Sequence, residues 1–205
     1  MANTNAPFGF RLTNSATGAA PNFEMRNATI AYNDSTKIYT GDPVKMTGTG
    51  GQVTQWTAAT AVSQLWGIFG GCKYLSSSQG KVVFSSFWPG ADVASTAQSS
   101  IIAYLIPCIM SPAPTFLVQT GSAGVTVDAI GANVDVQLGT GSTLSGQSGA
   151  FLDSTFTTTA TLPFRVIGLY GAGSTWGPAN AGAGSQAGAY NWVYVQANVT
   201  GSTGV

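Results

Sequence analysis

KIYTGDPVKMTGTGGQVTQWTAATAVSQLWGIFGGCKY, residues 37–74, is the stretch of this chain that decides its fold. It predicts three short strands, at residues 37–40, 44–46 and 52–56. The turn Gly41-Asp42-Pro43 separates the first two, because proline can begin a strand but cannot donate a hydrogen bond from inside one. A Gly/Thr-rich turn follows at 47–51, and the apolar residues 65–70 return the chain to a core.

The rest of the chain shows the same organisation of short strands and frequent turns. The clearest alternation is Asn133 to Leu138, where Val134, Val136 and Leu138 share one face, which is the period of a β-strand. Further strands are predicted at residues 28–32, 81–88, 101–106, 115–119, 125–128, 164–170 and 191–199. No stretch has a sustained helical period. We therefore predict an all-β fold, an antiparallel β-sandwich, jelly roll or barrel-like domain, with under about a tenth of its residues in helix.

The predicted domain organisation is simple. Residues 1–27 have no clean period and are broken by proline and glycine, so we predict an extended N-terminal arm that docks on a neighbouring subunit. Residues 28–200 form a single β-rich domain that contains a long loop at 171–189. Residues 201–205 form a tail.

The charge content excludes several classes of function. Only 7% of the 205 residues are charged, against roughly 25% in an ordinary soluble protein, and seven basic residues balance seven acidic ones. The basic residues are scattered singly, which disfavours nucleic-acid binding, and a net charge near zero favours association. The most apolar run, 101–110, is too short for a membrane helix, and the first residues do not resemble a secretory signal. We expect a protein that is made in the cytoplasm and does not bind membranes.

The sequence also predicts no catalytic, metal or cofactor site. Histidine is absent, and the carboxylates, such as Asp42 and Asp92, stand mainly in turns or on polar strand faces. Asp128 and Asp135 lack the spacing of a calcium loop, and the glycine clusters lack the Lys-Ser/Thr of a phosphate loop.

The two cysteines, Cys72 and Cys108, leave two states open. A disulfide is possible and cannot be deduced from the sequence, while a buried free thiol is the commoner state of such residues.

Several segments, in order along most of the chain, resemble the decoration or cement proteins of tailed-bacteriophage heads. The residues that carry the likeness are 1–11 (MANTNAPFGFR), 40–45 (TGDPVK), 87–90 (FWPG), 116–119 (FLVQ), 130–133 (IGAN), 162–168 (LPFRVIG) and 193–195 (VYV). The resemblance implies a β-rich, non-enzymatic virion protein that binds the outside of the capsid lattice, often as a trimer. The expected partners are the major capsid protein and further copies of this chain. The predicted interface residues are Phe8, Phe10, Arg11, Phe23 and Trp176.

The alternative is a fibre or surface module that recognises host glycans through exposed aromatic residues. The chain has five tryptophans, but most fall in predicted strands, where core or interface packing is the usual role. Trp176, in the long loop, is the exception. A third class, hydrolytic enzyme, is disfavoured by the absence of histidine.

Overall fold

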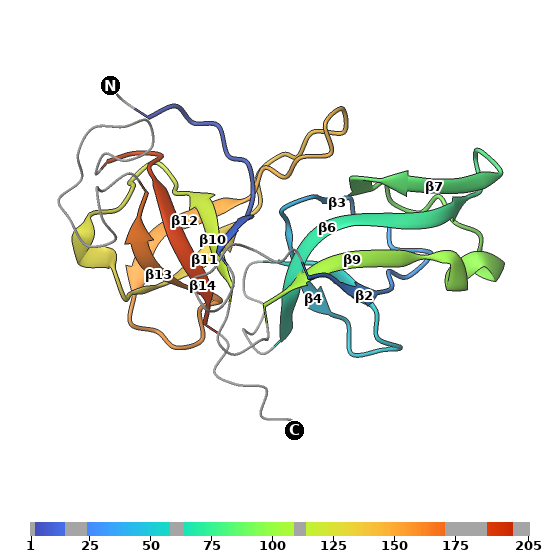
Figure 1. Cartoon of the computed structure of the whole chain (residues 1–205), viewed down its shortest axis with the longest axis horizontal. Coiled ribbons are helices and arrows are strands. Elements are labelled where there is room, and N and C mark those ends of the chain that lie inside the picture. Colours follow the sequence, from blue (N-terminus) through green and yellow to red (C-terminus); the bar gives the residue numbers. More distant parts are fainter. Residues whose placement is uncertain (1–2, 15–23, 58–63, 109–113, 171–187, 199–205) are drawn as a thin grey trace.

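The structure is a computed structural model, and it describes residues 3–14, 24–57, 64–108, 114–170 and 188–198. It is all-β, with 48% strand and 6% helix, and most strands pair in antiparallel fashion. The prediction of an all-β, sandwich-like fold is therefore confirmed. Figure 1 shows two large sheets that follow one another along the long axis of the molecule.

The first sheet has six strands in the order β1-β10-β14-β13-β11-β12. These strands are β1 (Arg11–Asn14), β10 (Thr115–Gln119), β14 (Trp192–Ala197), β13 (Phe164–Leu169), β11 (Asn133–Gln137) and β12 (Phe151–Thr157). The predicted alternation is confirmed on two of them. Val134 and Val136 of β11, and Val193 and Val195 of β14, point into one apolar core, which we call the first core.

The second sheet has the order β2-β9-β6-β4-β5, and β7 pairs with the far half of β6. Its strands are β2 (Arg26–Ala28), β9 (Ile102–Pro107), β6 (Leu65–Ser76), β4 (Pro43–Met46), β5 (Val53–Gln55) and β7 (Lys81–Ser85). Two short strands, β3 (Ile38–Tyr39) and β8 (Phe87–Trp88), form a ribbon of their own. The short 3₁₀ helices are η2 (Ser95–Ser100) and η3 (Val127–Ala129).

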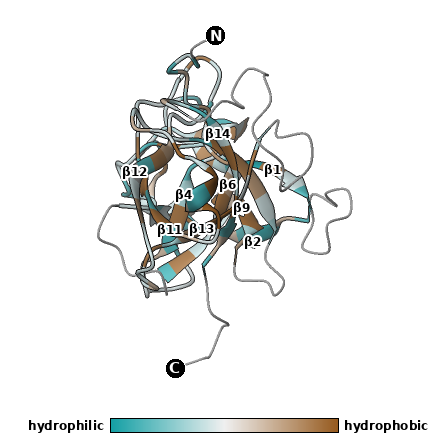
Figure 2. Ribbon diagram, turned by 90° about the vertical axis from the view of Figure 1, so that its left-hand side faces the viewer, coloured by the Kyte–Doolittle hydropathy of each residue, from teal (hydrophilic) through white to brown (hydrophobic). Residues whose placement is uncertain are grey.

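Strand β6 contributes side chains to two separate apolar cores. Its first residues, including Leu65 and Ile68, pack in the first core with the six-stranded sheet. Its later residues, from Phe69 to Tyr74, contribute to a second core with β9 and β4, and the register with β9 shifts between Phe69 and Gly71. This bulge requires glycine, because Gly71 has a φ of +132°, a conformation that side chains with a Cβ rarely adopt. Viewed along the long axis, Figure 2 shows hydrophobic ribbon concentrated around β6, β9 and β14.

The structure does not confirm an N-terminal arm. Residues 11–14 and 26–28 are strands of the two large sheets, so the chain before residue 28 belongs to the β body where it is described. Phe8 and Phe10 are only 7% and 3% exposed. Phe10 stacks on Phe164 with ring centroids 4.5 Å apart, because the first sheet offers these apolar rings a partner in the same chain.

Four local features differ from the predictions. The strand predicted at 28–32 overlaps β2 (Arg26–Ala28) only at Ala28. The predicted strand 81–88 is interrupted at Ser86, and its two parts, β7 and β8, pair with different strands. Residues 125–128 contain an isolated bridge at Val125 and the start of η3 rather than a strand. Strand β12 was not expected, since its sequence, FLDSTFT, is rich in hydroxyl side chains. The predicted loop 171–189 lies outside the described residues up to 187, as does the tail 201–205.

Candidate functional site

The turn at residues 40–43 forms a polar contact between the two sheets, in addition to the apolar contact that Leu65 and Ile68 of β6 make in the first core. The Gly41 amide donates to the carbonyl of Phe69 in β6 (2.8 Å), and the Gly41 carbonyl accepts from the Phe10 amide (2.9 Å). The Thr40 amide donates to Gly146, in the loop between β11 and β12, and the Thr40 carbonyl accepts from Ser148. One four-residue turn thus binds the N-terminal stretch, the second sheet and a loop of the first sheet.

Asp42 is the side chain that completes this junction. It is 2% exposed and accepts three hydrogen bonds: from the Tyr39 amide (2.8 Å), the Gln55 side-chain amide (2.7 Å) and the Ser148 hydroxyl (2.5 Å). Gln55 belongs to β5 of the second sheet, whereas Ser148 precedes β12 of the first. The carboxylate therefore ties together two sheets whose sequences are about a hundred residues apart.

Burial has an electrostatic consequence at Asp42. Desolvation raises the pKa of the carboxyl above its usual 3.8, and the hydrogen bonds from Ser148, Tyr39 and Gln55 oppose the rise without cancelling it. A perturbed pKa in a cleft is a mark of catalytic carboxylates. Here both oxygens are already occupied by donors of the chain itself, so the geometry assigns Asp42 a structural role.

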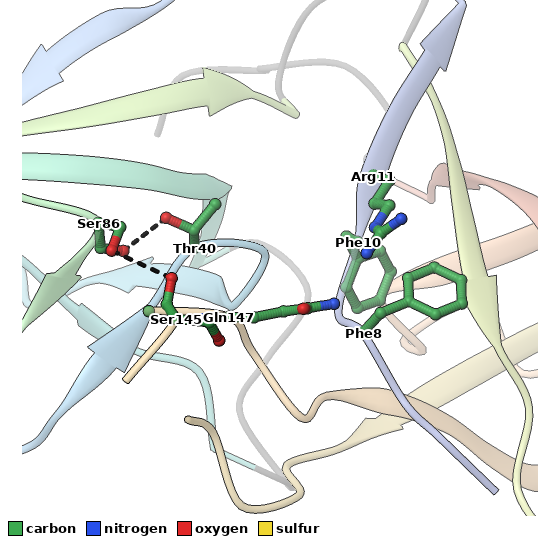
Figure 3. A pocket seen from close by; sticks show the side chains of 8 residues that line it. Phe8, Phe10, Arg11, Thr40, Ser86, Ser145 and Gln147 are labelled. Carbon is green, nitrogen blue, oxygen red and sulfur yellow. Dashed lines mark hydrogen bonds between the residues drawn. The ribbon is translucent and has the colours of Figure 1, made fainter. Parts of the chain in front are cut away.

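An open cavity of about 260 Å³ lies beside the junction, and Figure 3 shows its lining. Phe8 and Phe10 form one wall, with Arg11 of β1 next to them, and the opposite wall carries hydroxyl groups and Gln147. The Arg11 guanidinium lies 4.6 Å from the centre of the Phe8 ring, in a cation–π contact.

The cavity lacks the groups that chemistry would need. Its remaining polar side chains are Thr40, Ser86 and Ser145. Thr40 Oγ1 donates to the Ser86 carbonyl, Ser86 Oγ donates to the Ser145 carbonyl, and Ser145 Oγ accepts from the Gln147 backbone amide. No carboxylate or thiol is among the described lining residues. A hydroxyl without an adjacent base is a poor nucleophile, so the described lining offers a place for weak polar contact and no acid–base pair.

Asp34 and Asp92 are two further carboxylates that accept hydrogen bonds from nearby backbone amides and hydroxyl groups. Asp34 accepts from the Thr36 amide (2.9 Å) and the Thr54 hydroxyl (2.7 Å). Asp92 accepts from Ser76 and Ser78, and these bonds, led by that from the Ser76 hydroxyl, lower the pKa of the Asp92 carboxyl. Asp42 and Asp92 both lie in turns, as the sequence predicts, whereas nothing in the neighbouring sequence indicates that Asp42 is buried.

Both cysteines are free and buried, which resolves the choice that the sequence left open. Burial raises the pKa of the Cys72 thiol to about 12, and that of Cys108 is raised as well. Neither thiol therefore supplies a thiolate nucleophile at neutral pH. Within the described residues, no group of three or more potential ligands is placed to hold a metal ion. Among the described residues, no helix is long and apolar enough to cross a membrane.

The predicted interface residues do not gather at one surface. Phe8 and Phe10 are buried against the first sheet, where Phe8 meets Trp192 edge-on at 5.2 Å. Arg11 is exposed at the rim of the cavity. Phe23 and Trp176 lie outside the described residues.

A different apolar surface was missed by sequence reasoning. Phe84 and Val82 of β7 are 71% and 50% exposed, and Leu75 of β6, directly opposite Val82, is 37% exposed. We call these three residues the hairpin patch. The signal was present in Lys81-Val82-Val83-Phe84, where an unbroken apolar run on an edge strand must place alternate side chains in solvent.

Comparison of the chain with protein-family models, with curated proteins and with solved structures found no match.

Proposed function

We propose that this chain is a non-enzymatic virion protein that binds the outer capsid lattice of a tailed bacteriophage, as a homotrimer, and stabilises the head. The partner is the major capsid protein, and the place of action is the assembled particle. The proposal rests on the resemblance of the sequence segments and on the use that the chain makes of its few charged groups.

The observation that carries the proposal is the structural use of the buried carboxylate. An enzyme of this size would direct a tuned carboxylate or thiol into an open cleft. Here the Asp42 carboxylate accepts hydrogen bonds from Gln55 and Ser148 between the two sheets. The neighbouring cavity is lined by aromatic, hydroxyl and amide groups with a single arginine. A molecule with such a lining is better suited to binding other protein surfaces, here those of the capsid lattice, than to catalysis.

The low charge supports the same function. Many copies of a decoration protein are held close together on one shell, where a large net charge would make them repel each other. Seven positive and seven negative residues avoid this repulsion. Repetition over the lattice converts weak individual contacts into strong retention through multivalency.

The glycan-binding alternative has less support among the described residues. Trp56 and Trp88 are fully buried, and Trp66 and Trp192 are half-buried. A stacking platform for a sugar needs an aromatic face in solvent, and none of these four indoles is exposed.

The test compares particles with and without this chain. Heating or osmotic shock should rupture the particles that lack it at lower stress, and electron microscopy should place its density on the head. Equal survival of the two preparations, with the density at the tail, would refute the proposal and favour the fibre module.

A further inference from the structure

We propose that the β7 edge is a docking surface for a second copy of this chain, and that two β7 strands pair in antiparallel fashion about Val83. This contact is independent of the proposed function, because it would form between free molecules as well as on a capsid. It is also distinct from a three-fold contact, since antiparallel pairing of one strand with itself is two-fold.

The first argument is that β7 is an unprotected edge. Among the described strands it pairs only with β6, so its other edge presents backbone amides and carbonyls without a strand partner. Natural edge strands are usually protected against pairing with another chain by proline, by charges along their length or by a bulge. Residues 81–85 contain one charge, Lys81, at the first position, and the register with β6 is regular over all five residues.

The second argument is the composition of the two faces of β7. Val83 turns inwards and packs against the second core, whereas Val82 and Phe84 turn outwards. Lys73 lies opposite Phe84 on β6, with its ammonium 5.7 Å from the ring centre. This contact covers part of the ring but leaves Phe84 71% exposed, which is unusual for a residue of this size.

The third argument is that β7 is complementary to itself in one register. An antiparallel pair centred on Val83 sets Phe84 opposite the partner's Val82, and Lys81 opposite the partner's Ser85. Aromatic–β-branched pairs stabilise antiparallel strands. No like charges face each other in this register, whereas parallel pairing would set Lys81 beside the partner's Lys81.

The area of the hairpin patch sets the expected strength. A large aromatic side chain hides about 150–250 Å² when fully buried, so Phe84 still offers on the order of 100–150 Å². Leu75 lies on β6, one strand away from the pairing edge, so pairing would cover only the parts of Phe84 and Val82 that face the partner strand, well below the total of about 1,200 Å² typical of stable interfaces. Backbone pairing adds to this area, and we expect a weak, concentration-dependent dimer.

The test uses Phe84→Glu, matched by Val127→Glu as a control. The new carboxylate would face Lys73 across the strands, so the monomer keeps a favourable pair, while in the dimer it would replace the aromatic ring opposite the partner's Val82 by a charge. Val127 is 50% exposed in η3, on a different part of the chain. Circular dichroism would check that both variants keep the β fold.

Sedimentation velocity from about 10 µM to about 1 mM should show dimerisation of the wild type and of Val127→Glu, weakened at least about tenfold in Phe84→Glu. A wild type that remains monomeric throughout this range would overturn the proposal. So would a dimer that Phe84→Glu leaves unchanged. Loss of particle binding by Phe84→Glu in a protein that is always monomeric would reassign the patch to a coat-protein contact, and would likewise overturn it.

Cysteine pairing tests the register separately. Single variants Val82→Cys and Phe84→Cys, mixed and oxidised, should form a mixed disulfide, because these two positions face each other across the proposed pair. Each variant oxidised alone should cross-link several-fold less. Cys72 and Cys108 are buried and would not compete. Equal cross-linking of the single variants, or none in the mixture, would refute the register.

Discussion

Replacement of Asp42 by alanine is the most direct test of how the two sheets are held together. The substitution leaves the donors of Tyr39, Gln55 and Ser148 without their acceptor. A buried donor that loses its partner costs about 1–3 kcal/mol. Tyr39 and Gln55 are half-buried and their donors regain water in part, so the buried Ser148 hydroxyl and a fraction of the other two donors together cost about 2–4 kcal/mol. Removal of a desolvated carboxylate offsets part of this, and we expect a loss of about 2 kcal/mol.

Such a loss is a large part of the roughly 5–15 kcal/mol by which domains are usually stable. The assay is urea unfolding at pH 7, followed by tryptophan fluorescence. Asp128→Ala is the matched control, because that carboxylate accepts from the Thr126 hydroxyl at the surface, and its removal should cost under about 0.5 kcal/mol. Equal stability of the two variants would refute the assignment of Asp42 as the tie between the sheets.

The pH dependence of Asp42→Asn provides a second readout of the same site. The pKa of Asp42 is raised in the folded state, so its contribution to stability is present below the ordinary value of 3.8 and is lost as the pH rises through the raised pKa. The asparagine side chain of the variant does not titrate. The stability of the wild type relative to Asp42→Asn should therefore increase on acidification, and a difference that is constant with pH would contradict the raised pKa. Asp92, whose pKa is lowered, contributes with the opposite sign, but it is common to both proteins and cancels.

Three further outcomes are expected. Gly9→Ala should destabilise the chain by more than about 2 kcal/mol, because the new Cβ would lie 2.6 Å from Ser148 Cβ at a φ of +73°; Gly48→Ala, with φ +77° and open space around it, should cost only about 1 kcal/mol in the same urea assay. Trp56→Phe should change stability by less than about 1.5 kcal/mol in calorimetry, since the loss of ring volume is offset by removing an indole N–H that is buried without a hydrogen-bond partner. A thiol reagent at pH 8 should modify neither Cys72 nor Cys108 in the native protein and both in denaturant, and fast labelling of the native protein would contradict their burial.

The sequence predicted the features that depend on neighbouring residues. Pro43 begins β4, as expected of a residue that cannot donate from inside a strand, and β10 has the bounds that were predicted for it. The alternating valines of β11 face a core. These features are local, because they follow from the period of apolar side chains and from the geometry of proline.

Features that depend on distant residues were missed for a physical reason. Asp42 next to Gly and Pro has the composition of a solvent-exposed turn, and its burial depends on Ser148, about a hundred residues later. The apolar residues 65–70 were predicted only to return the chain to a core, whereas β6 runs from Leu65 to Ser76, with a bulge at Gly71 where the strand passes into a second core. Phe8 and Phe10 were assigned to a contact with a neighbouring molecule, since nothing nearby in the sequence reveals the ring of Phe164 that covers one of them.

The long strand β6 has a consequence for how the molecule would respond to force. At about 3.3 Å per residue, its twelve residues extend over about 40 Å. Leu65 and Ile68 anchor one end in the first core, and Cys72 and Tyr74 anchor the other end in the second. Tension applied along the long axis would load the hydrogen bonds to β4, β7 and β9 in shear, many at a time, rather than opening them one after another. The two cores would then unfold in a single step under force, and the molecule would resist extension as one mechanical unit.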